Sequence, residues 1–322
     1  MKKKSTLQIA SSLLVCAVLL VSACSGNAGK TAPEKASPEQ AAAAERVVTD
    51  AMGNNVTLPE HPQKVIATYL EDHLVALGVK PVAQWSVGEG SVQSYLQKEL
   101  AGIPAIPYDL PPEVVMSHSP DLIILESADL AAGDKYNQYS KIAPTYTVGI
   151  EKNTDWRKEL LAVGEVLNKS DEAKAVLAVY EEKAQAAKEK LQQGIGTKSA
   201  AALWVLPKST FVVKETMSSG DVLYKDLGFT VPEIVKEVTQ ASDANWSEIS
   251  LEKLAVLNTD YLFIVNSKGV PLKELVSDPV YANIPAVKNG HVYEFSKDSS
   301  WLYSGTIANG QIIDDVLKSV LN

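Results

Sequence analysis

The chain has 322 residues, of which 46% are hydrophobic and 21% charged, and its net charge is −9. An acidic chain without a basic cluster argues against nucleic acid as a partner, and against attachment to an anionic membrane through charge. The length is sufficient for two lobes of ordinary domain size.

The first 24 residues have the features of an export signal. Three lysines precede a mostly apolar stretch, which predicts a signal peptide over residues 1–23 that is too short and too polar to span a membrane. It closes on LVSAC, which resembles the lipobox of bacterial lipoproteins and implies a lipid on Cys24; an ordinary signal with an incidental cysteine is the alternative. Cys16 lies in the removed segment, so the mature chain can form no internal disulfide. Residues 24–45, rich in small, polar and proline residues, are expected to form a flexible tether.

Short apolar runs alternate with amphipathic stretches from Lys64 onward, as in KVIATY, DLIILES and PTYTVGI. This pattern predicts parallel strands with crossover helices, and hence a first α/β lobe over residues 46–154. The pattern restarts in a second α/β lobe over residues 195–322, where AALWVL matches KVIATY if Leu203 is set against Lys64. The expected fold class is therefore α/β, with two Rossmann-like lobes.

A helical region over residues 155–194 separates the two lobes. Its second part is rich in alanine, glutamate, lysine and leucine, which predicts a rod-like helix over residues 171–193. We expect Ser170 to be its N-cap and Gly194 to end it.

One helix–strand pattern occurs twice, as LPPEVVMSHSPDLIIL at 110–125 and ISLEKLAVLNTDYLFI at 249–264. Overlaying the two segments pairs four acidic residues: Glu113 with Glu252, and Asp121 with Asp260. The repeat indicates that the same helix–strand unit occurs in both lobes, with the aspartates as cap or turn residues where the strands begin.

The chain resembles the substrate-binding lipoproteins of bacterial ABC importers, most of all the class that carries ferric siderophores, with cobalamin binders as cousins. The likeness is carried, in order, by VVTDAMGNNVTLPEHPQKVIATYLEDHLVALGVKPV at 47–82, PDLIIL at 120–125, YSKIAPT at 139–145, WRKELLAVGEVLNK at 156–169 and the long helix after it. It implies a single rigid backbone helix between the lobes, a ligand cleft between them and no intrinsic cofactor. It also implies a monomer, lipid-anchored on the outer face of the membrane of a Gram-positive bacterium.

In that family one surface glutamate per lobe docks into an arginine pocket of the membrane permease, and the matching positions are Glu113 and Glu252. The second lobe departs from the family's Pro-Asp-Leu motif, because Thr259-Asp260-Tyr261 stands there. A carboxylate in the first turn of a helix is also favoured by the helix dipole, so local stability is an alternative reason for both glutamates.

Ligands of doubly wound sheets meet the carboxyl ends of the strands, so the residues closing each apolar run are candidates for the cleft. The predicted ligand-binding residues from these runs are Tyr69, Trp85, Tyr108, Trp204 and Lys214, and the loop SKDSSWLYSG adds Trp301 and Tyr303. The same rule also selects Ser127, which follows DLIILE. Trp85 and Trp301 are favoured because small polar residues surround each.

The basic residues restrict the charge of the ligand. The chain has two arginines, Arg46 at the edge of the lobe and Arg157 at the start of a helix, where an exposed role is expected. Because triply anionic ferric catecholates demand a cluster of cations, a neutral or weakly charged ferric hydroxamate is favoured. Lysines could still supply that cluster, with Lys208, Lys214 and Lys268 as candidates. Ferric catecholate, ferric citrate, haem and cobalamin therefore stay open.

Two other classes of protein would need residues that this chain lacks. A binder of bare metal ions would need converging histidines and carboxylates, but none of the four histidines, His61, His73, His118 and His291, stands at the end of an apolar strand run. His61 lies in a turn, and His73 and His118 lie in helix-like segments, so these three are expected at the solvated surface. An enzyme is not expected, because the chain has no G-x-S-x-G, H-E-x-x-H, C-x-x-C or phosphate-loop motif.

Overall fold

The computed structural model describes residues 46–321, apart from 87, 89–90, 153–154, 241 and 243. The signal peptide over 1–23, Cys24 and the tether over 24–45 lie outside the described residues and stay predictions. Within the described part, no helix is both long and apolar enough to cross a bilayer.

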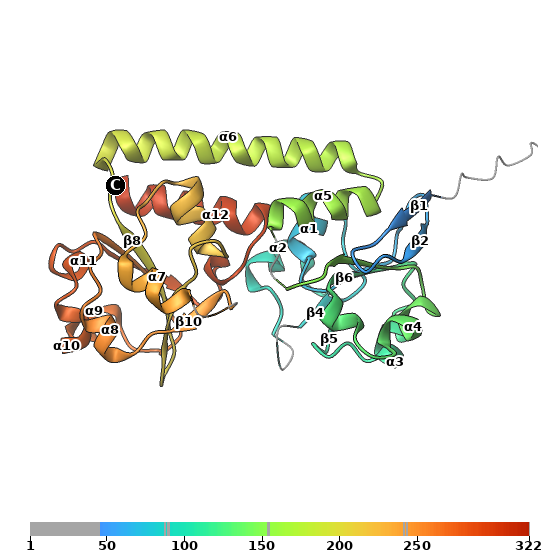
Figure 1. The fold of residues 1–322 in the computed structure, drawn as a ribbon, viewed down its shortest axis with the longest axis horizontal. Coiled ribbons are helices and arrows are strands. Elements are labelled where there is room, and N and C mark those ends of the chain that lie inside the picture. The colour runs from blue at the N-terminus through green and yellow to red at the C-terminus, as the bar shows by residue number, and fades with distance from the viewer. Residues whose placement is uncertain are drawn as a thin grey trace, which may run out of the picture. The chain divides into compact units, whose positions relative to one another are not determined.

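The first lobe is built on a parallel sheet in the order β3-β6-β7 (Figure 1). The run DLIILES becomes its central strand, and all six residues of that strand are buried, as expected for a strand covered on both faces. The strands of this lobe are β1 (Arg46–Thr49), β2 (Asn55–Leu58), β3 (Val65–Ala67), β4 (Gln84–Trp85), β5 (Ala105–Ile106), β6 (Leu122–Ser127) and β7 (Thr145–Gly149). Its helices are α1 (Glu71–Ala76), η1 (Ser94–Leu96), α2 (Gln97–Leu100), α3 (Pro112–Ser117), η2 (Ala128–Ala131), α4 (Lys135–Ser140) and α5 (Trp156–Val166).

The second lobe has a mixed five-stranded sheet in the order β10-β9-β8-β11-β12. Its strands are β8 (Ala200–Val205), β9 (Thr210–Val213), β10 (Trp246–Glu248), β11 (Tyr261–Asn266) and β12 (Val292–Ser296). Strands β8, β11 and β12 are parallel, while β9 pairs antiparallel with β8, and β10 pairs antiparallel with β9. Its helices are η3 (Asp221–Asp226), α7 (Glu233–Thr239), α8 (Leu251–Ala255), α9 (Leu272–Ser277), α10 (Pro279–Ala282), α11 (Pro285–Lys288), η4 (Ser300–Leu302) and α12 (Thr306–Leu321).

The predicted long helix is present as α6 (Ser170–Ile195), whose 26 residues extend roughly 39 Å. Figure 1 shows it running along both lobes, over α5 on one side and α12 on the other. Its buried residues, Ala173, Tyr180, Ala184, Ala187 and Leu191, lie on one face, and the alanines let the neighbouring helices approach closely.

Both predicted ends of this helix were wrong. The N-cap is Lys169 rather than Ser170, and its side chain makes no capping hydrogen bond. Gly194 lies inside the helix, where Leu321 of α12 packs close to it. The helix ends at Gly196, because its φ of 68° is incompatible with a further right-handed helical turn.

The repeated pattern is confirmed as a repeated structural unit. The Asp121 carboxylate accepts the backbone N–H of Lys64 at 2.9 Å, where β3 begins. The Asp260 carboxylate accepts the backbone N–H and the hydroxyl of Ser199, both at 2.8 Å, where β8 begins. Burial opposes ionisation of Asp260, but the hydrogen bonds from Ser199 keep the pKa of this carboxyl below its usual value. Each aspartate therefore ties the start of its own strand to the start of the neighbouring strand.

The register of the sheets corrects one part of the predicted repeat. Strand β6 pairs Leu122 with Val65, and β11 pairs Tyr261 with Ala200 at the same place in the unit. Val65 therefore corresponds to Ala200, and the alignment through Leu203 is four positions out.

A second connection joins the lobes besides α6. The Asp72 carboxylate in α1 accepts the backbone N–H groups of Ile307 and Ala308, in the first turn of α12, at 3.0 and 2.9 Å. A Cβ atom at Gly305 would come within 2.4 Å of the Asp72 side chain, so this approach requires glycine. Burial raises the pKa of Asp72, while hydrogen bonds from α12 and from the Tyr95 hydroxyl oppose that rise. A buried carboxylate of one lobe thus caps a helix of the other.

Candidate ligand-binding cleft

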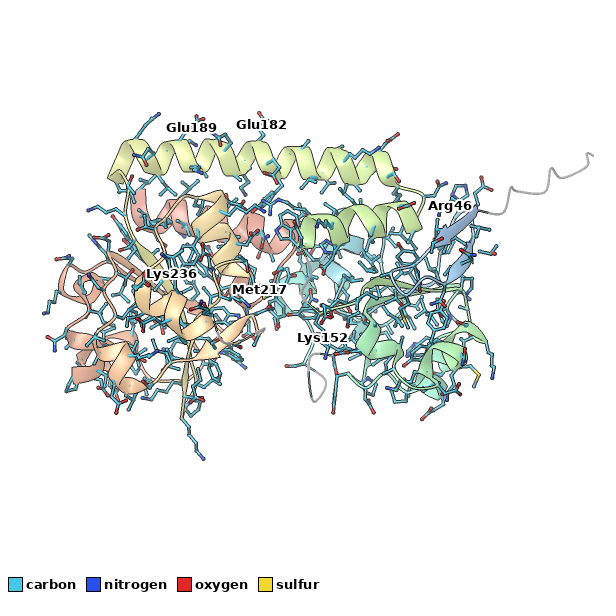
Figure 2. All side chains as sticks on the ribbon, viewed as in Figure 1. Arg46, Lys152, Glu182, Glu189, Met217 and Lys236 are labelled. Atoms are coloured by element: carbon cyan, nitrogen blue, oxygen red, sulfur yellow. The ribbon has the colours of Figure 1, made fainter. Side chains whose placement is uncertain are left out.

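Residues of both lobes enclose a cavity of about 340 Å³, called here the interlobe cavity. Its first-lobe lining is Tyr69, Glu126, Asp155, Trp156 and Glu159, and its second-lobe lining is Thr216, Met217, Ser218, Asp221, Lys225, Asn245 and Ser304. Tyr69 follows β3 and Glu126 stands near the end of β6, so the cavity opens at the carboxyl ends of parallel strands. Figure 2 shows Met217 in the middle of the molecule, where the two lobes meet.

A second cavity of about 490 Å³, the first-lobe cavity, shares Tyr69 and Glu126 with the first. The rest of its lining is Trp85, Tyr108, Asp109, Asp129, Leu130, Lys135 and Lys152. Because the two cavities share lining residues, we treat them as one cleft. Lys152 marks its first-lobe side in Figure 2.

Three of the predicted ligand-binding residues come together in this cleft. The ring of Tyr69 meets that of Trp85 edge-on, with centroids 5.6 Å apart, and the Trp85 indole N–H donates to the Tyr108 carbonyl at 2.9 Å. Tyr69 has a φ of 61°, a left-handed conformation that costs a tyrosine roughly 1 kcal/mol or more. Backbone strain of this kind persists where the surrounding structure fixes a side chain in one position.

Glu71 supports the aromatic wall from behind. Its buried carboxylate accepts the backbone N–H of Trp85 at 2.7 Å and the side-chain amide of Gln93 at 3.1 Å. Burial raises the pKa of Glu71 to about 8, although the hydrogen bond from Trp85 opposes that rise. The position of Trp85 therefore depends on a carboxyl group that holds its proton unusually strongly.

Tyr303, also predicted, lies beside the cleft rather than in its lining. Its ring centroid is 6.2 Å from that of Tyr69 and 5.1 Å from that of Tyr95, both in the first lobe. Ser304, the next residue, lines the interlobe cavity. Tyr303 therefore extends the row of aromatic rings from the first lobe to the second.

The prediction for Trp301 was wrong. Its side chain is fully buried and stacks on Phe263 and Phe295, at centroid distances of 5.1 and 4.3 Å. Its indole N–H donates to Asp315 at 2.9 Å, which opposes the rise that burial imposes on the pKa of Asp315. Trp301 lies in the short helix η4, between Ser300 and Leu302, and its indole is buried in the core of the second lobe.

Trp204 and Lys214 line neither part of the cleft. Trp204 packs against Phe211 and Trp246, with centroids 5.7 and 6.3 Å apart, and donates its indole N–H to Ser267. Lys214 donates its ammonium group to the Ser242 carbonyl at 2.6 Å. The other lysines suggested for a cationic cluster, Lys208 and Lys268, are exposed and also lie outside the lining.

The exposed role expected for Arg157 was also wrong. Its side chain is only 12% exposed, and its guanidinium contacts the carboxylates of Glu181, Asp221 and Asp226 at 2.5, 2.8 and 2.7 Å. The same group lies 4.5 Å from the centre of the Trp156 ring. Since these residues come from α5, α6 and η3, Arg157 joins both lobes to the connecting helix behind the cleft.

The surface role predicted for the histidines fails for His73. It is 2% exposed, and its Nε2 lies 3.4 Å from the Glu159 carboxylate, which lines the interlobe cavity. His61 is exposed, while His118 and His291 are partly buried. Within the described ranges, no group of three or more histidine, cysteine or carboxylate side chains could hold a metal ion.

Several lining residues were not predicted from the sequence. Glu126 could have been found, because it stands one residue before Ser127, which the strand-end rule selected; Ser127 is fully buried. Met217, Asp221 and Asn245 follow irregular segments of the second lobe and carry no periodic signal.

Two α/β lobes, a cleft at the carboxyl ends of their strands and one long connecting helix together define a two-lobed solute-binding protein. The periplasmic binding protein family matches residues 71–298, and the chain belongs to that family. It is a binding protein and not an enzyme, as predicted from the sequence.

Named relatives extend this likeness over nearly the whole chain. The iron(3+)-hydroxamate-binding protein FhuD of Bacillus subtilis is 28% identical, covering 92% of this chain and 93% of its own. The Fe(3+)-citrate-binding protein YfmC of the same organism is 29% identical, covering 97% and 96%. A crystal structure of a FhuD fold-family binding protein, from a B. subtilis ferrichrome ABC transporter, is 25% identical with a TM-score of 0.69. That match covers 85% of this chain and all of the other.

Proposed function

We propose that this protein captures a ferric siderophore of the hydroxamate type and delivers it to an ABC permease. The observation that carries the proposal is the cleft itself, with Tyr69, Trp85 and Tyr108 on its wall. Aromatic walls with a few hydrogen-bonding groups suit a bulky, weakly charged iron chelate. The similarity to a hydroxamate-binding relative supports the same ligand class.

The charges of the lining favour a ligand that is not strongly anionic. The described lining contains no arginine, and its three lysines already have bonding partners. Lys152 lies 3.0 Å from Asp129, Lys225 lies 3.7 Å from Asp221, and Lys135 donates to a backbone carbonyl. A triply anionic catecholate would meet these carboxylates without a compensating cluster of cations.

Ferric citrate is the second candidate, because the citrate-binding relative is as similar to this chain as the hydroxamate-binding one. Citrate complexes are anionic, so the two candidates differ in the charge that the cleft must accept.

Fluorescence titration of the purified protein separates these ligands. The panel is a neutral ferric hydroxamate, a ferric catecholate, ferric citrate, haem and cobalamin. We expect the hydroxamate to quench tryptophan emission most strongly, and Trp85→Phe to remove a large part of the quenching. Trp204→Phe is the matched control, because Trp204 lies outside the lining. Tight binding of citrate with no response to the hydroxamate would contradict the proposed ligand.

Docking to the permease is proposed for Glu113 and Glu252. Both are exposed and occupy the second position of equivalent helices, α3 and α8. Paired acids on two like lobes suit a partner made of two like halves. Replacing both by alanine should abolish uptake while ligand affinity is kept. Glu182 and Glu189, exposed on the outer side of α6 (Figure 2), provide the control pair.

Anchoring through a lipid on Cys24 is the last part of the proposal. Cys24→Ala should release the protein from the outer face of the cell membrane into the medium. Retention of this variant in washed membranes would overturn the proposed anchor.

A further inference from the structure

Exposed apolar side chains stand beside both proposed docking glutamates. Met116 in α3 is 59% exposed, and Leu251 and Val256, in α8 and directly after it, are each 64% exposed. Val115 and Leu254 bury the inner sides of these helices in the cores of the two lobes. Met116, Leu251 and Val256 belong to neither core, so packing within the lobes gives no reason for their apolar character.

The spacing places acid and apolar side chains within one helical turn of each other. Met116 follows Glu113 by three positions, and Val256 follows Glu252 by four, spacings that bring side chains together on a helix surface. Leu251 directly precedes Glu252. Figure 1 shows α3 and α8 on the side of their lobes away from α6. A partner that contacts both helices on this side meets the same combination in each lobe.

The two glutamates are available to such a partner. Across the described residues, neither Glu113 nor Glu252 forms an ion pair within 4.0 Å. Lys253, next to Glu252, pairs instead with Glu237 at 3.5 Å. Each exposed carboxylate is therefore available for contact with a cationic pocket.

We infer that the permease contact extends from Glu113 and Glu252 onto Met116, Leu251 and Val256, which fill apolar sites beside the cationic pockets. This inference rests on the docking role proposed above. Interfaces commonly combine an apolar centre, which supplies most of the affinity, with charges that orient the partner and speed its approach. The glutamates then orient the binding protein on the permease, and the apolar side chains lower the dissociation rate of the complex.

The test is iron uptake by the native cells with the full-length chain replaced by variants. Met116→Ser, Leu251→Ser and Val256→Ser are combined, and uptake of a radioactive ferric hydroxamate is measured. We expect uptake at limiting binding protein to fall about tenfold or more, the effect of losing one or more interface anchors. Ligand Kd and melting temperature of the purified variant should match the wild type. Val179→Ser is the matched control, because Val179 is 69% exposed on α6.

A conservative variant distinguishes apolar contact from a general disturbance of these helices. Met116→Leu, Leu251→Met and Val256→Ile keep the apolar character and should restore most of the uptake. If the serine variant transports like the wild type while alanine at both glutamates abolishes uptake, the docking role stands and the apolar extension is wrong. If neither variant affects uptake, the proposed docking role itself is wrong.

Discussion

Arg157 provides the strongest test of how the two lobes are held together. Replacing it by methionine keeps most of the side-chain volume but leaves Asp221 and Asp226, which are 11% and 4% exposed, without their main cation. Breaking a buried ion pair by removing one partner costs about 3 to 5 kcal/mol. Asp226 keeps a hydrogen bond from Tyr180, and Asp221 keeps one from Trp156, so we expect the lower end, about 3 kcal/mol.

The loss should depend on pH. Burial already raises the pKa of Asp226, and Arg157 opposes that rise, so the methionine variant raises it further. The folded variant then holds a proton that the unfolded chain releases. Its stability therefore falls as pH rises from the ordinary pKa of an aspartate through the raised folded value. Urea unfolding followed by tryptophan fluorescence should show a larger loss at pH 8 than at pH 5.

Two further variants define the result. Arg157→Lys keeps the charge without the three-way geometry and should show an intermediate loss. Adding Asp226→Asn to Arg157→Met should recover part of the stability by removing an uncompensated charge. A loss below about 1 kcal/mol at pH 8, or no recovery in the double variant, would refute the role assigned to the guanidinium.

Three other substitutions test separate features. Asp72→Ala removes the cap of α12 and should cost about 1 to 2 kcal/mol; hydrogen exchange at the first turn of α12 should become faster, and unchanged protection would contradict the contact between the lobes. Trp301→Ala should lower the free energy of urea unfolding by about 3 to 5 kcal/mol, because the indole is fully buried. The folded variant should bind ligand with unchanged affinity, and weaker binding would mean that Trp301 does contribute to the cleft. The unfolded chain releases the Glu71 proton near pH 4.5 but the folded protein keeps it to about pH 8, so wild-type stability should fall as pH rises between these values. Glu71→Gln should remove about a few kcal/mol of this loss of stability between the two pH values. An equal loss in variant and wild type would exclude Glu71 as its source.

Local sequence patterns were sufficient for the architecture and for one side of the cleft. Apolar runs located the strands, and the rule that ligands meet strand ends found Tyr69, Trp85 and Tyr108. Trp301 was favoured because small polar residues surround it, and that reasoning failed, because neighbouring residues do not tell which way a side chain points from a short helical turn.

Two further errors have a common cause in long-range contacts. Arg157 was expected to be exposed because it stands at the start of a helix, and His73 because it lies in a helix-like segment. Asp221 lies 64 residues from Arg157, and Glu159 lies 86 residues from His73. Burial of a charged side chain depends on partners at such separations, which no periodicity within a helix can reveal.

The contact between Asp72 and α12 has a consequence for how the protein is made. The carboxylate lies near the beginning of the folded region, and its backbone partner Ile307 follows 235 residues later. In a chain that folds as it leaves the export machinery, Asp72 lacks these two backbone donors until the last helix arrives. The first lobe therefore reaches its final stability only when the chain is complete, and a product truncated before α12 should stay open to proteases at a site far from its cut end.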